Sequence, residues 1–486
     1  MVTAEFAPVA KVGGLADMTT SLCDALAARG HDVRVVLPLY RHIDRREHGI
    51  RPVAKYQPFL VRVGQKIQMG RIFVQGSAAT PVKIYLVENK TLYNEPGIYA
   101  DNEGQPFAHG LARTVFHARA ALTVPTLLAW EPQIIHCHDA KAALTSVYLN
   151  HWYGKVPGLA NVHSLLTIHN LAYQEIHPRE SMELIGLPSV MGAFPGVLEF
   201  HGQLNLFKAG ILEADLVNTV SPTYAREVIS DPQLGCGLGS VLQARGEAFS
   251  GVLNGADVET WDPQNDVNLP AHYHIDALDG KQRCRMDLVT SLKLSDGNGP
   301  LVGMVSRLVE QKGIDLLMAN IDWMVRQGFC LALLGTGEER FRTSLTKAAR
   351  KHPKQVAFVD KFDEKLAHRI IAGSDMFLIP SLYEPCGLTQ MYALRYGAVP
   401  VVRHTGGLAD TVRDASRADG TGFVFHEYQP EALKTALNRA QEAWRDQKGW
   451  KTLMRRGMKH NFSWDESASA YESLYERLIA GEDEMK

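Results

Sequence analysis

Short runs of apolar and β-branched residues alternate with helical stretches along most of this 486-residue chain. Such a run fits a buried strand, and strands that alternate with helices indicate βαβ units with parallel sheets. The pattern predicts an α/β fold, opened by a short strand at Val2 to Glu5 and interrupted by a hairpin-rich insertion at roughly 51–90. The other expected strands lie within residues 31–40, 133–139, 164–170, 214–221, 300–307, 329–337, 355–362, 375–381 and 398–407.

The length of the chain indicates more than one domain, because a single hydrophobic core rarely serves so many residues. A glycine-containing stretch near 246–252 predicts a boundary, which gives one domain at 1–248 and a second at 249–462. In this division "GVLNG" is the first strand of the second domain. The sequence pattern alone leaves open which of the two domains the final helix, 463–486, packs on. Open parallel sheets bind ligands beyond the carboxyl ends of their strands, so we expect the functional residues there.

Charge and cysteine usage narrow the class of protein. The formal net charge of −2 argues against non-specific binding of nucleic acid. The six cysteines are scattered without a CxxC pair, which is typical of a reduced cytoplasmic protein rather than a disulfide framework. No apolar run approaches the ~20 residues of a membrane helix, and no secretion signal is visible. We expect a cytoplasmic protein without nucleic-acid or membrane partners.

The sequence GGLAD occurs twice, at 13–17 and at 406–410. Each copy lies between an expected strand and a helix start, where backbone N–H groups and the positive helix end can approach a phosphate. The preceding residues, "EFAPVAK" and "PVVRHT", share nothing, so a duplication explains the two copies poorly. We predict two loops, one in each domain, that are directed at one diphosphate ligand. Lys11 gives the first copy a charge that the second copy lacks.

Polar residues follow several of the expected strands. Asp139 and His169 end two strands of the first half, and Arg307 with Lys312 follows a strand of the second half. Glu384 lies just beyond the strand at 375–381. Arginine and lysine at this spacing can reach one anionic group, and a carboxylate can bind sugar hydroxyls.

Each of these residues also has a structural interpretation. Arg307 and Lys312 fit a solvated helix face, and Asp139 fits a cap of the following helix. Pro385 is expected to be the first residue of the next helix, so that Glu384 stabilises that helix through its dipole. The common position after strand ends favours the functional interpretation.

The motif "HCHD" raises the hypothesis of a zinc site. His136 and His138 lie two residues apart on one face of a strand, and His163 and His169 are candidates for a third ligand. No motif with metal-ligand spacing is present. We therefore prefer packed, hydrogen-bonded histidines in a buried strand, and expect no metal.

Longer motifs occur in order over nearly the whole chain: "KVGGLAD", "HCHD", "TIHNLAYQ", "GVLNGAD", "VSRLVEQKG", "EPCGLTQMYALRYGAVPVVRHTGGLADTV" and "TGFVF". Together they resemble the bacterial glycogen synthase and starch synthase family. The resemblance implies a GT-B fold: two Rossmann-like domains that face each other across a cleft, with the last helix crossing back onto the first domain. It implies transfer of glucose from ADP-glucose to the non-reducing end of an α-1,4-glucan such as glycogen, with retention of configuration and without metal or other cofactor.

The resemblance also implies which residues act. The residues assigned to the reaction are Asp139, His169, Arg307, Lys312 and Glu384. Those assigned to binding of the sugar nucleotide are Lys11, Gly13, Gly14, Phe362, Cys386, Gly387, Thr389, Thr405, Gly406 and Gly407. In this assignment the two cations neutralise the leaving phosphate, Asp139 and His169 hold the glucosyl unit, Glu384 binds its hydroxyls, and Phe362 stacks on the adenine.

No carboxylate partner for Glu384 is identifiable in the sequence, whereas a retaining double displacement needs two carboxylates about 5 Å apart. We therefore favour a front-face substitution in which the leaving phosphate accepts the proton of the acceptor. The family usually follows its HxHD aspartate with tryptophan and a polar residue, but Ala140 and Lys141 stand here.

Other functions remain as alternatives. UDP-glucose is open as the donor, because a stacked aromatic ring accepts either base. A nucleotide-dependent oxidoreductase is disfavoured by the absence of GxGxxG. A non-catalytic glucan-binding protein is disfavoured by the full set of polar residues, and a phosphorylase would require pyridoxal phosphate.

Overall fold

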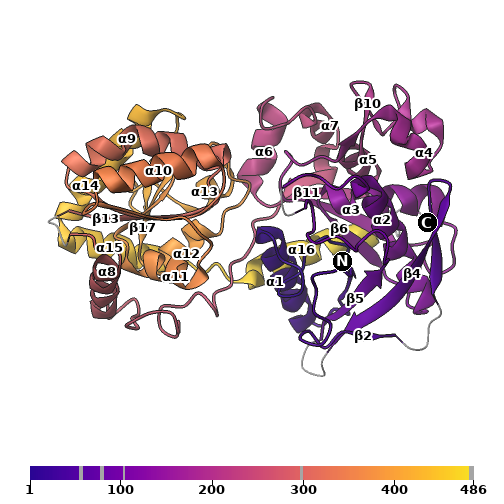
Figure 1. Cartoon of the computed structure of the whole chain (residues 1–486), viewed down its shortest axis with the longest axis horizontal. Helices are drawn as coiled ribbons and strands as arrows, with labels where there is room; N and C mark the ends of the chain where they lie inside the picture. The colour runs from indigo at the N-terminus through magenta and orange to yellow at the C-terminus, as the bar shows by residue number, and fades with distance from the viewer. Residues whose placement is uncertain (54–57, 77–80, 102–103, 296–298, 481–486) are drawn as a thin grey trace. The chain divides into compact units, whose positions relative to one another are not determined.

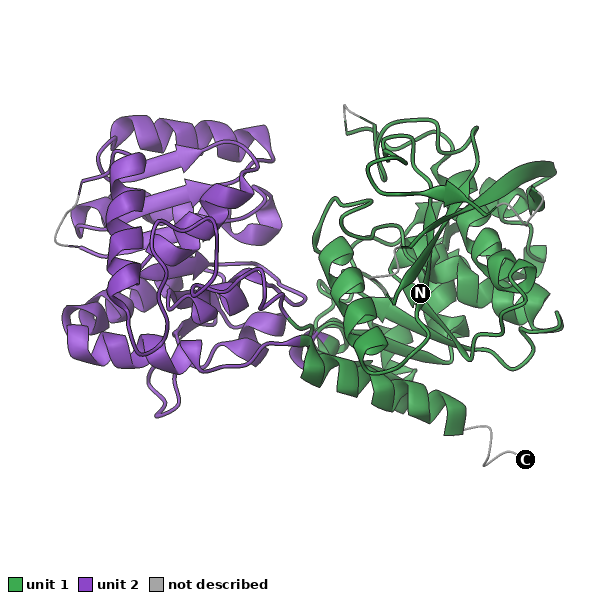
Figure 2. Ribbon diagram, turned by 90° about the horizontal axis from the view of Figure 1, so that it is seen from below, with its two compact units in different colours: residues 1–220, 225–255, 464–486 green, residues 221–224, 256–463 purple. Residues whose placement is uncertain are grey.

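The structure is a computed structural model that describes residues 1–53, 58–76, 81–101, 104–295 and 299–480. The chain divides into two compact units, coloured separately in Figure 2. Unit 1 comprises Met1–Val220, Ala225–Gly255 and Trp464–Lys486, and unit 2 comprises Ser221–Tyr224 and Ala256–Ser463. Each unit is built around a largely parallel sheet, as the strand–helix alternation predicts.

The sheet of unit 1 has two parts, with strand orders β12-β11-β7-β6 and β1-β5-β4-β2. Val2 joins them, because it bridges in parallel to Cys137 of β6 on one side and to Val36 of β1 on the other. The expected opening strand is thus reduced to this one bridging residue. The strands are β1 (Arg34–Pro38), β2 (Arg51–Pro52), β3 (Phe59–Val63), β4 (Lys66–Gln75), β5 (Lys83–Glu88), β6 (Ile134–His138), β7 (His163–Ile168), β11 (Leu216–Thr219) and β12 (Phe249–Gly251).

A small antiparallel sheet of unit 1 contains β8 (Ile176–His177), β9 (Glu199–Phe200) and β10 (Gln203–Asn205). The helices of unit 1 fall into groups that are visible in Figure 1: α1 packs on α16, and α3 packs on both α2 and α5. The α-helices are α1 (Gly14–Ala28), α2 (Gly110–Leu127), α3 (Ala140–Tyr148), α4 (Met182–Ile185), α5 (Leu206–Glu213), α7 (Gly239–Gln243) and α16 (Trp464–Ala480). Helix α6 (Pro222–Ser230) begins with residues assigned to unit 2 and continues in unit 1 from Ala225. Short 3-10 turns lie at Arg179–Ser181, Ser189–Gly192 and Gly246–Ala248, and a π-helical turn lies at Leu149–Tyr153.

The sheet of unit 2 is fully parallel, with strand order β15-β14-β13-β16-β17-β18. From β13 the chain first adds strands on one side and then, from β16, on the other. The topological switch point therefore lies between β13 and β16, where open α/β sheets bind their ligands. The strands are β13 (Leu301–Val305), β14 (Cys330–Leu334), β15 (Val356–Val359), β16 (Met376–Ile379), β17 (Val399–Arg403) and β18 (Phe423–Phe425).

Helices cover both faces of this sheet (Figure 1). Helix α9 packs with α10 and α14, whereas α11 packs with α8 and α12. The helices are α8 (Asp279–Ser291), α9 (Ile314–Arg326), α10 (Glu339–Lys351), α11 (Glu364–Gly373), α12 (Thr389–Arg395), α13 (Gly406–Thr411), α14 (Pro430–Arg445) and α15 (Gln447–Met458), with a 3-10 turn at Glu310–Lys312. No helix in the described part of the chain is long and apolar enough to cross a membrane.

The predicted boundary at 248/249 is wrong by several residues. Strand β12 does not open the second unit, because it pairs in parallel with β11 at the edge of the first sheet. The chain passes into unit 2 after Gly255, and it returns to unit 1 at Trp464 with α16. The sequence could not reveal this, since the strand pattern of "GVLNG" fits the edge of either sheet.

A buried cluster of aromatic and hydrogen-bonded polar side chains holds the start of unit 2 in place. The Asp266 carboxylate accepts hydrogen bonds of 2.7 Å from His368 Nδ1 and from the Tyr396 hydroxyl. The Trp261 ring stacks on His368, with ring centroids 3.6 Å apart. Because these polar atoms are buried, their mutual hydrogen bonds offset the loss of hydration. The cluster ties the segment that follows the boundary to α11 and α12.

Candidate active site

Two charged residues meet at the switch point of unit 2. Lys312 follows β13 and Glu384 follows β16, and Lys312 Nζ lies 2.6 Å from Glu384 Oε2. The Ser381 hydroxyl donates to the same carboxylate oxygen at 3.0 Å. Arg307, also after β13, is exposed, and within the described ranges its guanidinium has neither a hydrogen bond nor an ion pair. The switch point thus carries a buried carboxylate, a paired cation and a second cation open to solvent.

Gly313 explains how Lys312 reaches Glu384. Its φ is +67°, and a Cβ there would lie 2.0 Å from the carbonyl oxygen of Pro380. Only glycine lets the turn after β13 pass this close to the end of β16. The close approach brings Lys312, one residue earlier, against the carboxylate that follows β16.

The glycines of the second GGLAD copy pack closely against the backbone of the loop that carries Glu384. A Cβ on Gly406 would lie 1.9 Å from the Glu384 carbonyl oxygen, and one on Gly407 would lie 2.0 Å from that of Cys386. The Gly407 N–H donates to the Glu384 carbonyl at 3.1 Å. The expectation that both glycines turn their backbone to a ligand therefore fails for Gly407, because its N–H is already used within the protein. This glycine pair instead allows the start of α13 to pack on the loop that carries Glu384.

The helix after Glu384 begins later than expected. Pro385 is not its first residue; α12 begins at Thr389, because Gly387 (φ +73°) turns the chain first. Gln390 Nε2 closes this turn by donating to the carbonyls of Cys386 at 3.1 Å and Gly387 at 2.9 Å. The interpretation of Glu384 as a helix cap is therefore excluded.

The other residues of the second half that the sequence assigns to binding of the sugar nucleotide also lie in unit 2. Cys386 is buried and Thr389 is half-buried. Thr405 precedes α13 and is buried. Phe362 follows β15, with 81% of its surface exposed. A large aromatic ring this exposed at the end of a strand is available to stack on a planar ligand.

The first GGLAD copy has different surroundings. A Cβ on Gly13 or on Gly14 would have nothing within 4 Å, so this loop faces open space. However, the backbone N–H groups of Val12 and Gly13 donate to Glu5 Oε2, at 2.6 and 2.8 Å. Lys11 Nζ lies 2.7 Å from Asp17 of the same motif. A carboxylate of the protein thus occupies the N–H group of Gly13, one of the glycines that the sequence assigns to the ligand.

Glu5 and Tyr99 contact the first glycine loop, directly or through each other, and neither was among the residues predicted from the sequence. The Tyr99 hydroxyl donates to Glu5 Oε1 at 2.6 Å, so both oxygens of this buried carboxylate are bonded. The sequence held one sign of Glu5, because it is an acidic residue at the carboxyl end of the expected opening strand. It held none of Tyr99, because the two residues are 94 positions apart and Tyr99 lies in a loop.

Asp139 connects the ends of β6 and β7. Its Oδ1 accepts hydrogen bonds from the backbone N–H groups of His169 at 2.7 Å and Asn170 at 3.3 Å. Its backbone, at φ 60° and ψ −179°, is in a region that residues other than glycine rarely adopt, and such strain clusters at functional sites. Burial raises the pKa of its carboxyl to about 7, which the hydrogen bonds from the two N–H groups oppose.

His169 lies beside His138, with His169 Nε2 3.1 Å from His138 Nδ1. Burial lowers the pKa of His169 to about 3, so its ring is neutral at physiological pH. His163 does not join them, because it begins β7 whereas His169 follows the other end of that strand. Both nitrogens of His136 are hydrogen bonded to protein groups. Among the residues that the structure describes, no three His, Cys, Asp or Glu side chains are placed to hold a metal ion.

The departure at Lys141 has a local explanation. Lys141 Nζ lies 2.7 Å from Glu175 Oε1, and His177 Nε2 lies 3.3 Å from the other oxygen of Glu175. Lys141 therefore ties the start of α3 to the loop that follows His169. Ala140, beside it, is buried and adds no polar group.

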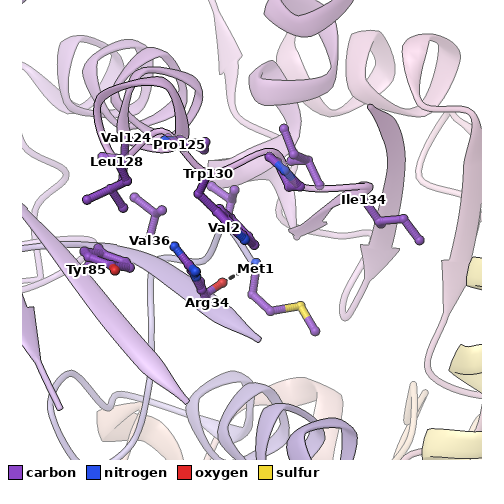
Figure 3. A pocket seen from close by; sticks show the side chains of 13 residues that line it. Met1, Val2, Arg34, Val36, Tyr85, Val124, Pro125, Leu128, Trp130 and Ile134 are labelled. Atoms are coloured by element: carbon purple, nitrogen blue, oxygen red, sulfur yellow. Dashed lines mark hydrogen bonds between the residues drawn. The ribbon is translucent and has the colours of Figure 1, made fainter. Parts of the chain in front are cut away.

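A cavity in unit 1, drawn in Figure 3, lies away from these residues. It is lined by Met1, Val2, Arg34 and Ile134, among others, which stand at the starting ends of the strands, and the Met1 amino group donates to the Arg34 carbonyl at 2.7 Å. Its volume of about 30 Å³ suits water molecules rather than a sugar. The candidate site residues of this unit, Asp139 and His169, follow the opposite, carboxyl ends of β6 and β7.

Comparisons with known proteins agree with this arrangement. The family model "Starch synthase catalytic domain" matches residues 1–244, and the model "Glycosyl transferases group 1" matches residues 292–455. The chain is 43% identical over 482 residues to a glycogen synthase of Anaeromyxobacter sp. (strain Fw109-5), with 99% of each chain covered. It is 40% identical over 478 residues to glycogen synthase 2 of Geobacter sulfurreducens, with 98% of this chain and 97% of that protein covered.

The fold of the chain also matches that of a solved starch synthase structure. The catalytic domain of starch synthase IV from Arabidopsis thaliana, bound to ADP and acarbose, matches with a TM-score of 0.88 and 32% identity, covering 99% of this chain and 98% of that one. A sucrose-phosphate synthase from Thermosynechococcus elongatus shares the fold at a TM-score of 0.60 and 19% identity. By sequence and by fold, the chain belongs to the glycogen and starch synthase family and is a glycosyltransferase with the GT-B fold.

Proposed function

We propose that the chain transfers glucose from ADP-glucose to the non-reducing end of an α-1,4-glucan, with retention of configuration and release of ADP. The observation that carries the proposal is the group at the switch point of unit 2, where Lys312 pairs with Glu384 and the Arg307 cation is open to solvent. The starch synthase IV structure that the chain resembles was solved with ADP and acarbose bound.

In the proposed reaction, the bond between glucose and the diphosphate breaks and negative charge gathers on the leaving phosphate oxygen. Arg307 and Lys312 stabilise this charge, because cations placed where negative charge develops lower the energy of the transition state. Two protein cations supply positive charge here, and we propose that the reaction needs no metal or other cofactor.

Glu384 fits the binding of sugar hydroxyls better than nucleophilic attack. Its Oε2 is bonded to Lys312 and Ser381, which stabilises the carboxylate and lowers its tendency to attack carbon. We therefore propose a front-face substitution: the acceptor hydroxyl attacks on the side of the leaving group, and the departing phosphate takes the acceptor proton. His169 and Asp139 are assigned to the glucosyl unit in this scheme.

The donor is tested by steady-state rates with ADP-glucose and UDP-glucose side by side, at equal concentrations, on glycogen. The proposal expects a higher kcat/KM with ADP-glucose. A higher kcat/KM with UDP-glucose would show that UDP-glucose is the preferred donor, and the proposed glucosyl transfer itself would stand. Incubation with a chelator tests the metal-free scheme, which expects an unchanged rate.

A further inference from the structure

A buried network of polar side chains links the C-terminal helix to the site histidines. His136 Nδ1 lies 2.9 Å from the Tyr475 hydroxyl of α16, and His136 Nε2 lies 2.6 Å from Thr167 Oγ1 of β7. The Thr167 hydroxyl donates to Asn218 Oδ1 of β11 at 2.6 Å, and Asn218 Nδ2 donates to the Tyr471 hydroxyl at 3.2 Å. Tyr471 and Tyr475 are one helical turn apart, so α16 holds both ends of the network.

The strands explain why these groups meet. Thr167 is paired with both His138 and Asn218 in the parallel register, so the three side chains lie in one row on one face of the sheet. His136, two residues before His138, shares that face. Cys137 points to the opposite face, where the Ser146 hydroxyl of α3 lies 3.8 Å from its sulfur. Helix α16 therefore covers the histidine face.

With the Asn218 amide oriented as in the structure, its oxygen toward Thr167 and its nitrogen toward Tyr471, the network has one arrangement of protons. The Thr167 hydroxyl has a single hydrogen, which goes to Asn218, so it can only accept from His136 Nε2. His136 therefore carries its proton on Nε2 and accepts the Tyr475 hydroxyl hydrogen on Nδ1. Burial lowers the pKa of His136 well below its usual value, in agreement with a neutral ring. Thr167 and Tyr475 thus together hold one tautomer of a buried histidine, from the two sides of its ring.

The ring of His136 in turn fixes that of His138. Their centroids are 4.1 Å apart with a tilt of 32°, and His138 is fully buried. Among the described residues, His138 Nε2 has no hydrogen-bond partner, so Nδ1, which faces His169 Nε2, makes its one polar contact. A buried N–H without an acceptor is rarer than a buried acceptor without a donor. His138 therefore donates from Nδ1, and His169 keeps its proton on Nδ1.

We propose that Tyr475 and Tyr471 of α16 act as positioning residues, which hold the His136–His138 stack so that His138 orients the ring of His169. The inference rests on the proposed function through the role of His169 in glucosyl transfer. The helix that returns to unit 1 after unit 2 would then contribute to the chemistry and not only to stability.

The test is a double-mutant cycle of Tyr475→Phe and His169→Ala in the full-length protein, read as kcat and KM for transfer from ADP-glucose to glycogen. Tyr475→Phe removes only the hydroxyl. We expect kcat to fall about three- to tenfold, the rate equivalent of one neutral hydrogen bond, with KM changed less than about twofold. In the His169→Ala background, the same substitution should change kcat less than about twofold, because its effect passes through His169.

Tyr148→Phe is the matched control. The Tyr148 hydroxyl, also in unit 1, donates a buried hydrogen bond of 2.7 Å to the Ile185 carbonyl. Tyr148→Phe removes this hydrogen bond, so it should shift the thermal midpoint about as much as Tyr475→Phe does. Its kcat should stay within about twofold of the wild-type value. Wild-type kcat in Tyr475→Phe, or an equal loss in both backgrounds, would overturn the proposal.

A second readout separates this inference from the proposed function. A wild-type protein that transfers no glucose refutes the function, and the network is then judged from ring ¹⁵N chemical shifts of His136, assigned with His136→Gln. The inference expects a protonated Nε2 and a bare Nδ1, altered by Tyr475→Phe but not by Tyr148→Phe. A proton on Nδ1 of His136 would contradict it.

Discussion

Lys312 Nζ and Glu384 Oε2 lie 2.6 Å apart, although 72 positions separate the two residues in the sequence. The contact exists because the strands that precede them, β13 and β16, are neighbours at the switch point of their sheet. Each residue orients the other, and removal of Lys312 would leave the buried Glu384 carboxylate without its cationic partner, which is costly.

Substitution of Lys312 by alanine should lower kcat by about 10²–10³, the usual effect of losing one group that stabilises a developing anion. Lys351→Ala is the control, because Lys351 Nζ forms an equally short contact of 2.6 Å with Asp322 on an exposed surface. Exposed pairs contribute little, so this variant should keep wild-type kcat. Equal activity of Lys312→Ala and Lys351→Ala would remove Lys312 from the site.

The two GGLAD glycine pairs should respond differently to alanine. Gly407→Ala places a Cβ 2.0 Å from the Cys386 carbonyl oxygen, so the loop that carries Glu384 must move, and we expect loss of both activity and thermal stability. Gly14→Ala meets nothing within 4 Å and sits at the start of α1, so its thermal midpoint should stay within a few degrees of wild type. Comparable destabilisation by the two substitutions would show that the packing difference is unimportant.

Asp139 predicts a pH dependence of stability. Its pKa is raised from 3.8 to about 7, so the folded protein holds a proton that the unfolded chain has released. The associated stability is complete below about pH 4 and is lost as the pH rises through 7, by at most about 1.4 kcal/mol of unfolding free energy per pH unit. Asp139→Asn cannot titrate, so wild type should lose stability relative to this variant between pH 4 and 7. Denaturant unfolding across that range measures the difference, and a difference independent of pH would contradict the prediction.

The buried cluster of unit 2 should contribute to stability and not to catalysis. His368→Ala leaves Asp266 without one of its two short hydrogen bonds, which should lower the free energy of unfolding by about 3–5 kcal/mol. Arg369→Ala, the next residue of α11, breaks a partly exposed pair with Asp287 and should cost less than about 1 kcal/mol. Folded His368→Ala should retain kcat within about twofold, and a large loss of kcat without loss of stability would assign it to the site.

The fold was predictable because its signals are local. Each expected strand at 300–307, 329–337, 355–362, 375–381 and 398–407 matches one strand of the second sheet, since a buried parallel strand is a short apolar run in any context. The positions of Arg307, Lys312 and Glu384 followed from the same signal, because residues after parallel strands share one edge. That Lys312 and Glu384 touch was not predictable, since strand order is set by packing.

Contacts between distant segments supplied what the sequence could not. The Glu5 carboxylate at the first glycine loop accepts a hydrogen bond from Tyr99, 94 positions away, and the bond from Tyr475 to His136 spans 339 positions. The error in the predicted boundary also comes from a contact between distant segments, because the pairing of β12 with β11 decides which sheet β12 joins. Lys141 looked like a departure from the family pattern, and its contact with Glu175 could be read only from the folded chain.

The central claim is tested most directly by transfer of labelled glucose from ADP-glucose to glycogen, followed by digestion of the product with β-amylase. The account predicts incorporation by the wild-type protein, a loss of about 10²–10³ in rate for Lys312→Ala, and release of the label as maltose, because the new unit is α-1,4-linked at a non-reducing end. No incorporation by the wild-type protein, or label that resists β-amylase, would contradict it.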